Sequence, residues 1–234
     1  MKVLAMDSSG LVATVALLCD NIIVGEYTIH NKKTHSQTLL PMISDMLSMA
    51  DVDISEIDVI AAASGPGSFT GLRIGASTAK GLAQALDVPI VAVPTLEALA
   101  FHFAGTDAVV CPMMDARRNQ AYYGIYDVSE KIPRVLVEQD AAPVEEVMNK
   151  VNELGRPVIF LGDGVPVFES KIEEMITVPY QCALPSERYQ KASSVAILGQ
   201  LYWEQGKAVP AKEFAPIYLR MSQAERERLE REQA

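Results

Sequence analysis

The fold is decided by the stretch IDVIAAASGPGSFTGLRIGASTAKGLAQAL, residues 57–86. Residues 57–63 are mainly small and β-branched apolar residues, which is the composition of a strand buried on both faces. Residues 64–71 contain three glycines and one proline, so they predict a tight loop. Residues 72–86 follow a helical pattern that includes two glycines, each costing about 1 kcal/mol relative to alanine. These glycines indicate that a neighbouring element packs very close to the helix.

A glycine loop between a strand and a helix suggests a phosphate site, because free N–H groups and the helix dipole attract anions. The spacing does not match the known forms. After Gly65 and Gly67 the next glycine is Gly71, one residue too late for G-x-G-x-x-G, and no Gly-Lys-Ser/Thr follows. A structural turn that directs a small-residue helix at another surface is therefore the favoured interpretation.

The chain has 234 residues, 49% of them hydrophobic, which is enough for a sizeable core in one or two domains. Its net charge of −10 argues against binding nucleic acid without a more basic partner. Cys19, Cys111 and Cys182 lie far apart in the sequence, so neither a disulfide framework nor a zinc ribbon is expected. With Asp7 interrupting the first apolar run and no stretch of about 20 apolar residues, we expect no export, no membrane span and a cytoplasmic location.

Hydrophobic periodicity predicts an α/β unit over residues 1–103. Its expected strands are 3–6, 11–18, 22–29, 57–63 and 88–93, and its expected helices are 36–50, 72–86 and 96–103.

A second α/β unit is predicted over residues 104–220. Its expected strands are 108–114, 121–128, 135–138, 158–161 and 177–180, and its expected helices are 143–154, 167–175 and 193–205. The apolar segment 213–220 is expected to dock on a surface. Residues 221–234 form a charged tail, in which alternating acids and arginines at 225–232 favour a solvated helical end.

The expected helix 36–50 carries two apolar stripes. The stripes comprise Leu40, Ile43, Leu47 and Ala50, and, one residue earlier, Leu39, Met42, Met46 and Met49. One stripe is sufficient to seat a helix on its own core. A second stripe rich in methionine indicates either contact with another chain or deep burial in its own domain, and both alternatives stay open.

Catalytic patterns are sparse. Asp7 and the hydroxyl residues after the first strand are typical of actin, sugar-kinase and Hsp70 domains, which suggests a role for Asp7 in binding magnesium or phosphate. The alternative is that these residues only form the turn after the strand. A kinase of that type would need a second acid-glycine loop, whereas this chain has Asp115-Ala116-Arg117. No two histidines have the spacing of a helical metal pair, and the centre of Gly67-Ser68-Phe69-Thr70-Gly71 is not serine, so metalloprotease and serine-hydrolase chemistry are disfavoured.

Four motifs in order along the chain resemble the bacterial TsaB family, formerly called YeaZ. They are HSQTLLPMI (35–43), SGPGSFTGLRIGASTAKGLA (64–83), MDARRNQAYYGIY (114–126) and APIYLR (215–220). The resemblance implies a two-lobed actin/Hsp70-like (ASKHA, ribonuclease H-like) α/β fold with mixed sheets flanked by helices. It also implies a partnership with the catalytic subunit TsaD and the ATPase TsaE in making threonylcarbamoyladenosine in tRNA.

TsaD carries a metal-binding histidine pair where this chain has Thr95 and Leu99. The resemblance therefore implies a non-catalytic pseudoenzyme with no catalytic, metal or cofactor-binding residue of its own. ATP and a metal ion are expected in the partner subunits. The chain is expected to contact tRNA only indirectly, through the complex. Whether a nucleotide binds at the interface with the partner stays open. The rival hypotheses are a small-molecule phosphotransferase of the actin superfamily and a metallopeptidase-like protein.

The resemblance places both the TsaD contact and a homodimer formed without TsaD on helices 36–50 and 72–86. The implied interface residues are Leu39, Met42, Ile43 and Met46 on the first helix and Arg73, Gly75, Ser77, Ala79, Lys80, Gly81 and Gln84 on the second. We expect bulky residues at Gly75, Ala79 or Gly81 to break the contact while sparing the fold, provided that these positions face outward.

Overall fold

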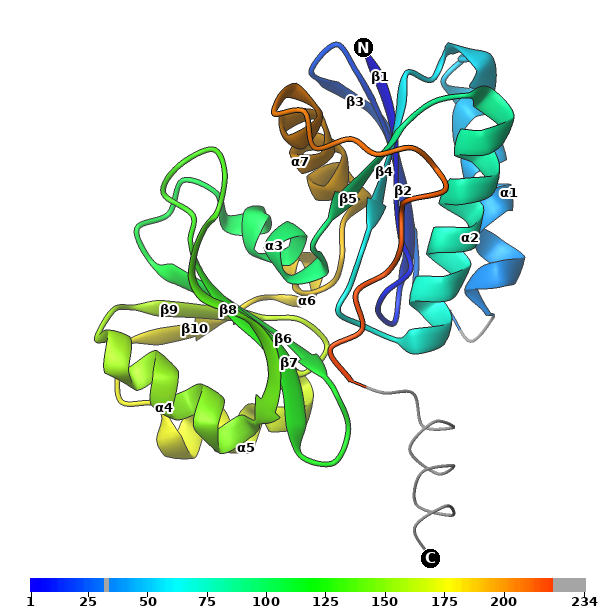
Figure 1. Cartoon of the computed structure of the whole chain (residues 1–234). Helices are drawn as coiled ribbons and strands as arrows, with labels where there is room; N and C mark the ends of the chain where they lie inside the picture. The colour runs from blue at the N-terminus through cyan, green and yellow to red at the C-terminus, as the bar shows by residue number, and fades with distance from the viewer. Residues whose placement is uncertain (32–33, 221–234) are drawn as a thin grey trace, which may run out of the picture.

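The computed structural model describes residues 1–31 and 34–220. Two lobes lie side by side, each built on a five-stranded mixed sheet (Figure 1). The predicted helical end at 225–232 lies outside the described residues.

The first sheet has the order β3-β2-β1-β4-β5. Its strands are β1 (Lys2–Asp7), β2 (Ala13–Cys19), β3 (Ile22–Ile29), β4 (Val59–Ala63) and β5 (Ile90–Val93). The first three form an antiparallel meander, and β4 and β5 add in parallel. Helices α1 (His35–Met49) and α2 (Phe69–Leu86) cover one face (Figure 1). A short 3₁₀ helix, η1 (Ile54–Glu56), precedes β4.

The second sheet repeats this pattern with the order β10-β9-β6-β7-β8. Its strands are β6 (Val109–Asp115), β7 (Gln120–Asp127), β8 (Arg134–Pro143), β9 (Val158–Leu161) and β10 (Tyr180–Cys182). Helices α4 (Val144–Leu154) and α5 (Val165–Met175) cover one face, and the short α6 (Pro185–Arg188), which the sequence did not predict, follows β10. Two lobes that each consist of an antiparallel meander extended by two parallel strands confirm the predicted actin/Hsp70-like fold class.

The stretch at 57–86 forms the predicted strand, loop and helix. Every residue of β4 is buried between β1 and β5. Helix α2 begins three residues earlier than predicted because the Ser68 side chain accepts a hydrogen bond from the backbone N–H of Gly71 at 3.3 Å and caps the helix. A Cβ at Gly71 would lie 2.0 Å from the carbonyl oxygen of Ser8, so only glycine fits there. The first turn of α2 thus packs directly on the turn after β1.

Helix α1 corrects the expectation of two stripes. Its buried side chains are Thr38, Leu39, Met42, Ile43, Met46 and Leu47, and all of them except Thr38 come from the two predicted stripes. At about 100° per residue these positions form one broad face, and that face packs on the first sheet. The methionine-rich stripe is therefore core rather than an outward surface, apart from Met49, which is 81% exposed.

The expected boundary between residues 103 and 104 does not divide the lobes correctly. Helix α3 (Thr95–Ala100), with the 3₁₀ turn η2 (Phe101–Phe103) after it, packs on the second sheet. Helix α7 (Ala192–Glu204) returns to the first sheet and covers the face opposite α1 and α2. The ideal Cβ position of Gly199 lies only 2.4 Å from the Cβ of Ala61, so glycine permits this close approach of α7 to β4.

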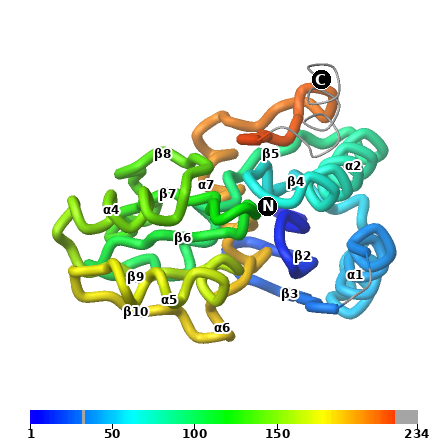
Figure 2. Tube along the Cα trace, turned by 90° about the horizontal axis from the view of Figure 1, so that it is seen from below, coloured from blue at the N-terminus to red at the C-terminus, as the bar shows by residue number. Residues whose placement is uncertain are grey.

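The chain after α7 also belongs to the first lobe. Val209 pairs with Ile90 at the edge of the sheet, and Phe214 is buried in the core beneath α1 and α2. Figure 2 shows this segment passing along β5 and α2. The prediction that segment 213–220 docks on a surface is confirmed: the Ile217 N–H donates to the Ser64 carbonyl at 2.7 Å.

Candidate functional site on helices α1 and α2

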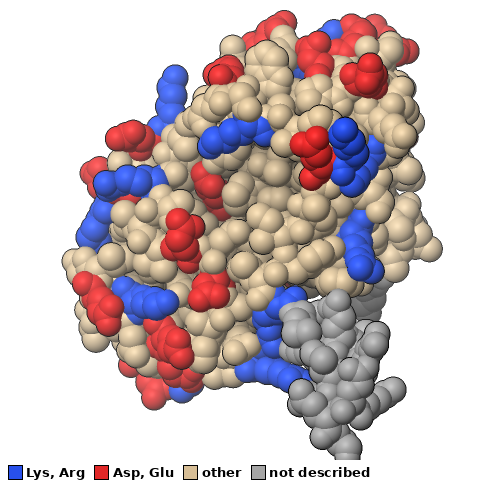
Figure 3. Space-filling view, in the orientation of Figure 1, with Lys and Arg blue, Asp and Glu red and all other residues tan. Residues whose placement is uncertain are grey.

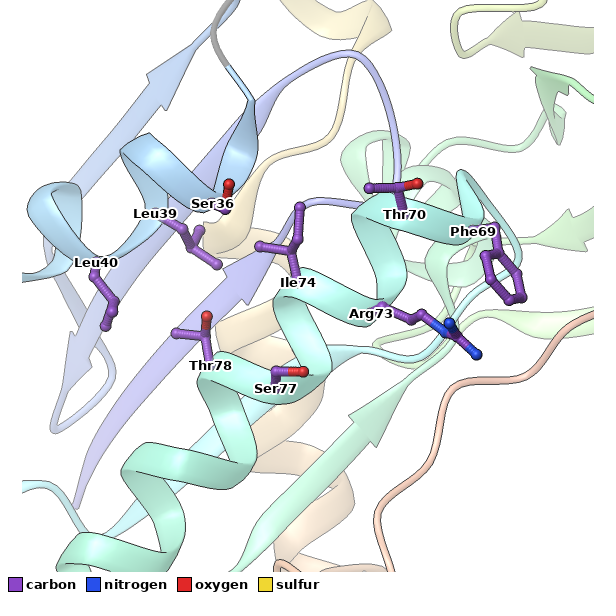
Figure 4. Close-up of a pocket in the computed structure, with 9 residues that line it drawn as sticks. All are labelled: Ser36, Leu39, Leu40, Phe69, Thr70, Arg73, Ile74, Ser77 and Thr78. Atoms are coloured by element: carbon purple, nitrogen blue, oxygen red, sulfur yellow. The ribbon is translucent and has the colours of Figure 1, made fainter. Parts of the chain in front are cut away.

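A groove of about 460 Å³ lies on the outer surface between α1 and α2. Its lining residues are Ser36, Leu39, Leu40, Phe69, Thr70, Arg73, Ile74, Ser77 and Thr78. Figure 4 shows Leu39 and Leu40 from α1 facing Ile74 and Thr78 from α2 across the gap. Leu39 is 1% exposed and Leu40 is 51% exposed, so Leu39 forms the floor and Leu40 the accessible rim.

The α1 residues assigned to the interface by resemblance are not at the surface. Leu39, Met42, Ile43 and Met46 are each at most 4% exposed and belong to the core of the first lobe. Because their side chains already pack on the sheet, they cannot contact another chain without opening this core. Of the four, only Leu39 reaches the groove.

The α2 residues divide between two faces. Arg73, Ser77, Gly81 and Gln84 are exposed on the outward side. Lys80 is half-buried, and its Nζ donates to the carbonyl oxygen of Phe214 at 3.0 Å, so it holds the C-terminal segment on the helix.

Gly75 and Ala79 face inward. Ala79 is fully buried, and a Cβ at Gly75 would lie 2.7 Å from the Oγ of Ser8. The condition that these positions face outward therefore fails at both, and a bulky residue at either would disturb the packing of the first lobe. Gly81 does face outward, because a Cβ there would meet nothing within 4 Å.

Several groove residues escaped the sequence analysis. Leu40 is not among the residues that the resemblance implies for the interface, although Ile43 of the same stripe is. Phe69 and Thr70 had been placed in the loop, because the capping role of Ser68 was not recognised. Ser68 three residues before Gly71, followed by a helical pattern, was the available signal.

A second cavity, of about 540 Å³, lies between the lobes. Asp115, Asp163 and Arg117 from the second lobe face Ser9, Ser68 and the segment 217–220 across it. Burial raises the pKa of Asp163 to about 6, and its Oδ1 accepts the N–H of Asp115 at 3.3 Å. Asp115 in turn pairs with Arg117 at 3.0 Å.

Asp7 does not line this cavity. It is 1% exposed; its Oδ1 accepts the N–H of Ser9 at 2.7 Å, and its Oδ2 has no hydrogen-bond partner among the residues that the structure describes. Burial raises the pKa of this carboxyl to about 6.

Within residues 1–31 and 34–220, no three His, Cys, Asp or Glu side chains lie close enough together to hold a metal ion. Thr95 and Leu99, the two positions compared with the histidine pair, are fully buried.

Comparison with known proteins identifies the family. Residues 23–228 match the family described as "TsaD: tRNA N6-adenosine threonylcarbamoyltransferase". The tRNA threonylcarbamoyladenosine biosynthesis protein TsaB of Bacillus subtilis is 32% identical over 225 residues, which cover 96% of each chain. This chain belongs to the TsaB family.

The TsaB protein of Haemophilus influenzae is also 32% identical, over 94% of each chain. The solved structure of YeaZ from Pseudomonas aeruginosa superposes with a TM-score of 0.79 at 30% identity, covering 93% of this chain and 99% of that one. Membership of the TsaB family gives the chain a role in tRNA threonylcarbamoyladenosine biosynthesis. Among the described residues, no helix is long and apolar enough to cross a membrane.

Proposed function

We propose that this chain is the non-catalytic scaffold and activator of a tRNA threonylcarbamoyladenosine-forming complex. It binds the catalytic subunit TsaD through the outward face of α1 and α2. The observation that supports this most is the open groove between the two helices, which has an apolar floor and the half-exposed Leu40 at its rim.

The outward face of α2 suits close contact with another helix. Ser77, Gly81 and Ala85 are four residues apart and all exposed, so they form a row on one face with little side-chain bulk. A partner helix can approach such a row closely, while Leu40 supplies the apolar anchor beside it. Anchors of this kind carry much of the energy of an interface.

In this proposal the chain stabilises the active conformation of TsaD and performs no chemical step. ATP and the metal ion belong to the partner subunits, with TsaE as the ATPase of the complex. The homodimer formed by the isolated chain uses the same two helices. Binding of TsaD and homodimer formation are therefore mutually exclusive.

The test is a Leu40→Asp substitution, which places a charge at the rim of the groove. We expect the Kd for TsaD to rise at least about 30-fold, which corresponds to about 2 kcal/mol, with an unchanged unfolding temperature. The matched control is Ile22→Asp, because Ile22 is 66% exposed on β3, outside the groove. Wild-type affinity of the Leu40 variant for TsaD would reject this surface as the docking site.

The competing phosphotransferase hypothesis makes a separate prediction. It requires the isolated chain to bind ATP with magnesium and to hydrolyse it, with loss of both in Asp7→Asn. Calorimetry and phosphate release on the purified chain decide between the two functions. We expect neither binding in the micromolar range nor turnover.

A further inference from the structure

Four arginines lie on or beside the cavity between the lobes, although the chain as a whole carries a charge of −10. Arg117 in the β6–β7 turn and Arg220 at the end of the described residues line the cavity. Arg118 follows Arg117 in the turn, and Arg73 lies on α2 against Phe69, which also lines the cavity. Figure 3 shows basic side chains at the lower edge of this face of the molecule.

Side-chain contacts and chain connectivity link Arg73, Arg220 and the β6–β7 turn into one edge. The Arg73 guanidinium lies 4.2 Å from the ring centroid of Phe69, and that ring lies 4.7 Å from the ring of Tyr218. Two residues further on, Arg220 donates a hydrogen bond to the carbonyl oxygen of Ala116. The edge therefore runs from α2 across the C-terminal segment to the β6–β7 turn, and its middle is the aromatic pair.

The β6–β7 turn holds its arginines outward. Arg117, Arg118 and Asn119 have φ values of +66°, +57° and +57°, so three consecutive non-glycine residues adopt the left-handed conformation. This backbone is strained, and such strain persists only where the surrounding structure supports it. The Arg117 side chain is 82% exposed, and Arg118 is exposed with no partner among the described residues.

Acidic and basic groups line the cavity together: Asp115 and Asp163 lie beside Arg117 and Arg220. A small anion placed there would face carboxylates as well as arginines. An extended polyanion that crosses the edge would meet arginines and could stack on Tyr218, which is 41% exposed. Guanidinium groups bind phosphate oxygens in a bidentate manner, and aromatic rings stack on unpaired bases.

We propose that this edge, defined by Arg73, Arg117, Arg118, Arg220 and the Phe69–Tyr218 pair, contacts the phosphate backbone of the substrate tRNA within the complex. The proposal rests on the proposed function, because the complex brings the tRNA to the chain. It refines the expectation that tRNA is met only indirectly: the net charge keeps the isolated chain from binding RNA, while a local basic edge adds contacts once the partner holds the tRNA.

The experiment uses the full chain assembled with TsaD and TsaE and an unmodified substrate tRNA. Arg118→Glu is the main variant, because Arg118 is exposed and its loss breaks no contact of the fold. Lys131→Glu is the matched control: Lys131 is exposed beyond the other end of β7, roughly 25 Å away for an eight-residue strand. Assembly is checked by co-elution, and the tRNA affinity is then measured over a range of salt concentrations.

We expect the Arg118→Glu complex to assemble normally and to bind tRNA about tenfold more weakly. The slope of log K against log salt should fall by about 1, as for the loss of one phosphate contact. Lys131→Glu should change neither quantity. An assembled Arg118→Glu complex with wild-type affinity and salt slope would overturn the proposal and leave the scaffold function intact. Failure to assemble would instead make the edge a protein contact and would equally overturn the proposal.

Discussion

Gly75 of α2 lies directly against Ser8 in the turn after β1. A Cβ at position 75 would come within 2.7 Å of the Ser8 Oγ, which itself donates a hydrogen bond to the Gly71 carbonyl at 2.8 Å. This contact fixes the helix against the sheet. It also determines which face of α2 is left for a partner.

The contact predicts opposite effects for two glycines on one helix. Gly75→Val should destabilise the isolated chain by about 1–3 kcal/mol, because the added atoms force Ser8 or the helix to move. Gly81→Val should leave the unfolding free energy within about 0.5 kcal/mol, since the site is open, and should weaken TsaD binding. Urea denaturation measures the unfolding free energy of both variants, and a binding titration measures the affinity of the Gly81→Val variant for TsaD. Equal destabilisation by the two substitutions would contradict the assignment of faces.

The burial of α1 predicts that substitutions at two positions of the expected methionine-rich stripe have different effects on the free energy of unfolding. Leu39→Ala should cost about 2–5 kcal/mol of unfolding free energy in the isolated chain, because Leu39 is 1% exposed in the core. Met49→Ala, at an 81% exposed position, should change stability by less than about 0.5 kcal/mol. Chemical denaturation of the unpartnered chain distinguishes core from interface, since an interface residue would show its cost only in partner binding.

Most of the elements could be predicted because each is encoded locally. The short run of small and β-branched residues at 57–63 favours a buried strand, and Gly65 and Gly67 with Pro66 favour a loop directly after it. The return of α7 to the first sheet could not be predicted, because it depends on contacts between positions far apart, such as Gly199 against Ala61. Length and pattern identify α7 as a helix but do not state which sheet it covers.

The candidate site was predictable only as a pair of helices. Both apolar stripes of α1 merge into one buried face, and the sequence does not reveal which flanking position stays exposed. Leu40 remains outside because the neighbouring α2 leaves a groove beside it. Likewise, Gly75 and Gly81 are both glycines of α2, and the sequence does not distinguish them. Only the contact of Gly75 with Ser8 shows that Gly75 faces the core while Gly81 faces outward.

The buried Asp7 predicts a pH-dependent stability. Its pKa rises from 3.8 to about 6 on folding, so the folded state binds more protons than the unfolded state between these values. Stability associated with Asp7 is present below pH 3.8 and is lost as the pH rises through about 6. Asp7→Asn should therefore gain stability relative to wild type between pH 4 and pH 7.5, by on the order of 2 kcal/mol.

Thermal unfolding of both proteins across this pH range measures the effect. Asp45→Asn is the control, because Asp45 is exposed on α1. A constant difference between the Asp7 variant and wild type at all pH values would show that the carboxyl is not titrating in this range.

The C-terminal segment gives the last prediction. The Ile217 N–H donates to the Ser64 carbonyl at 2.7 Å, and the Ile217 carbonyl oxygen would lie 2.5 Å from a Cβ at Gly65. Ile217→Pro removes this donor and should cost about 1–3 kcal/mol, because the acceptor is left buried without its partner. Ile217→Ala keeps the N–H and removes a side chain that is 45% exposed, so it should cost less. Hydrogen exchange at the Ser68 and Gly71 amides, which donate to the Ser9 carbonyl and to the Ser68 Oγ, should increase in the proline variant alone, since the segment then loosens from the loop that leads into α2.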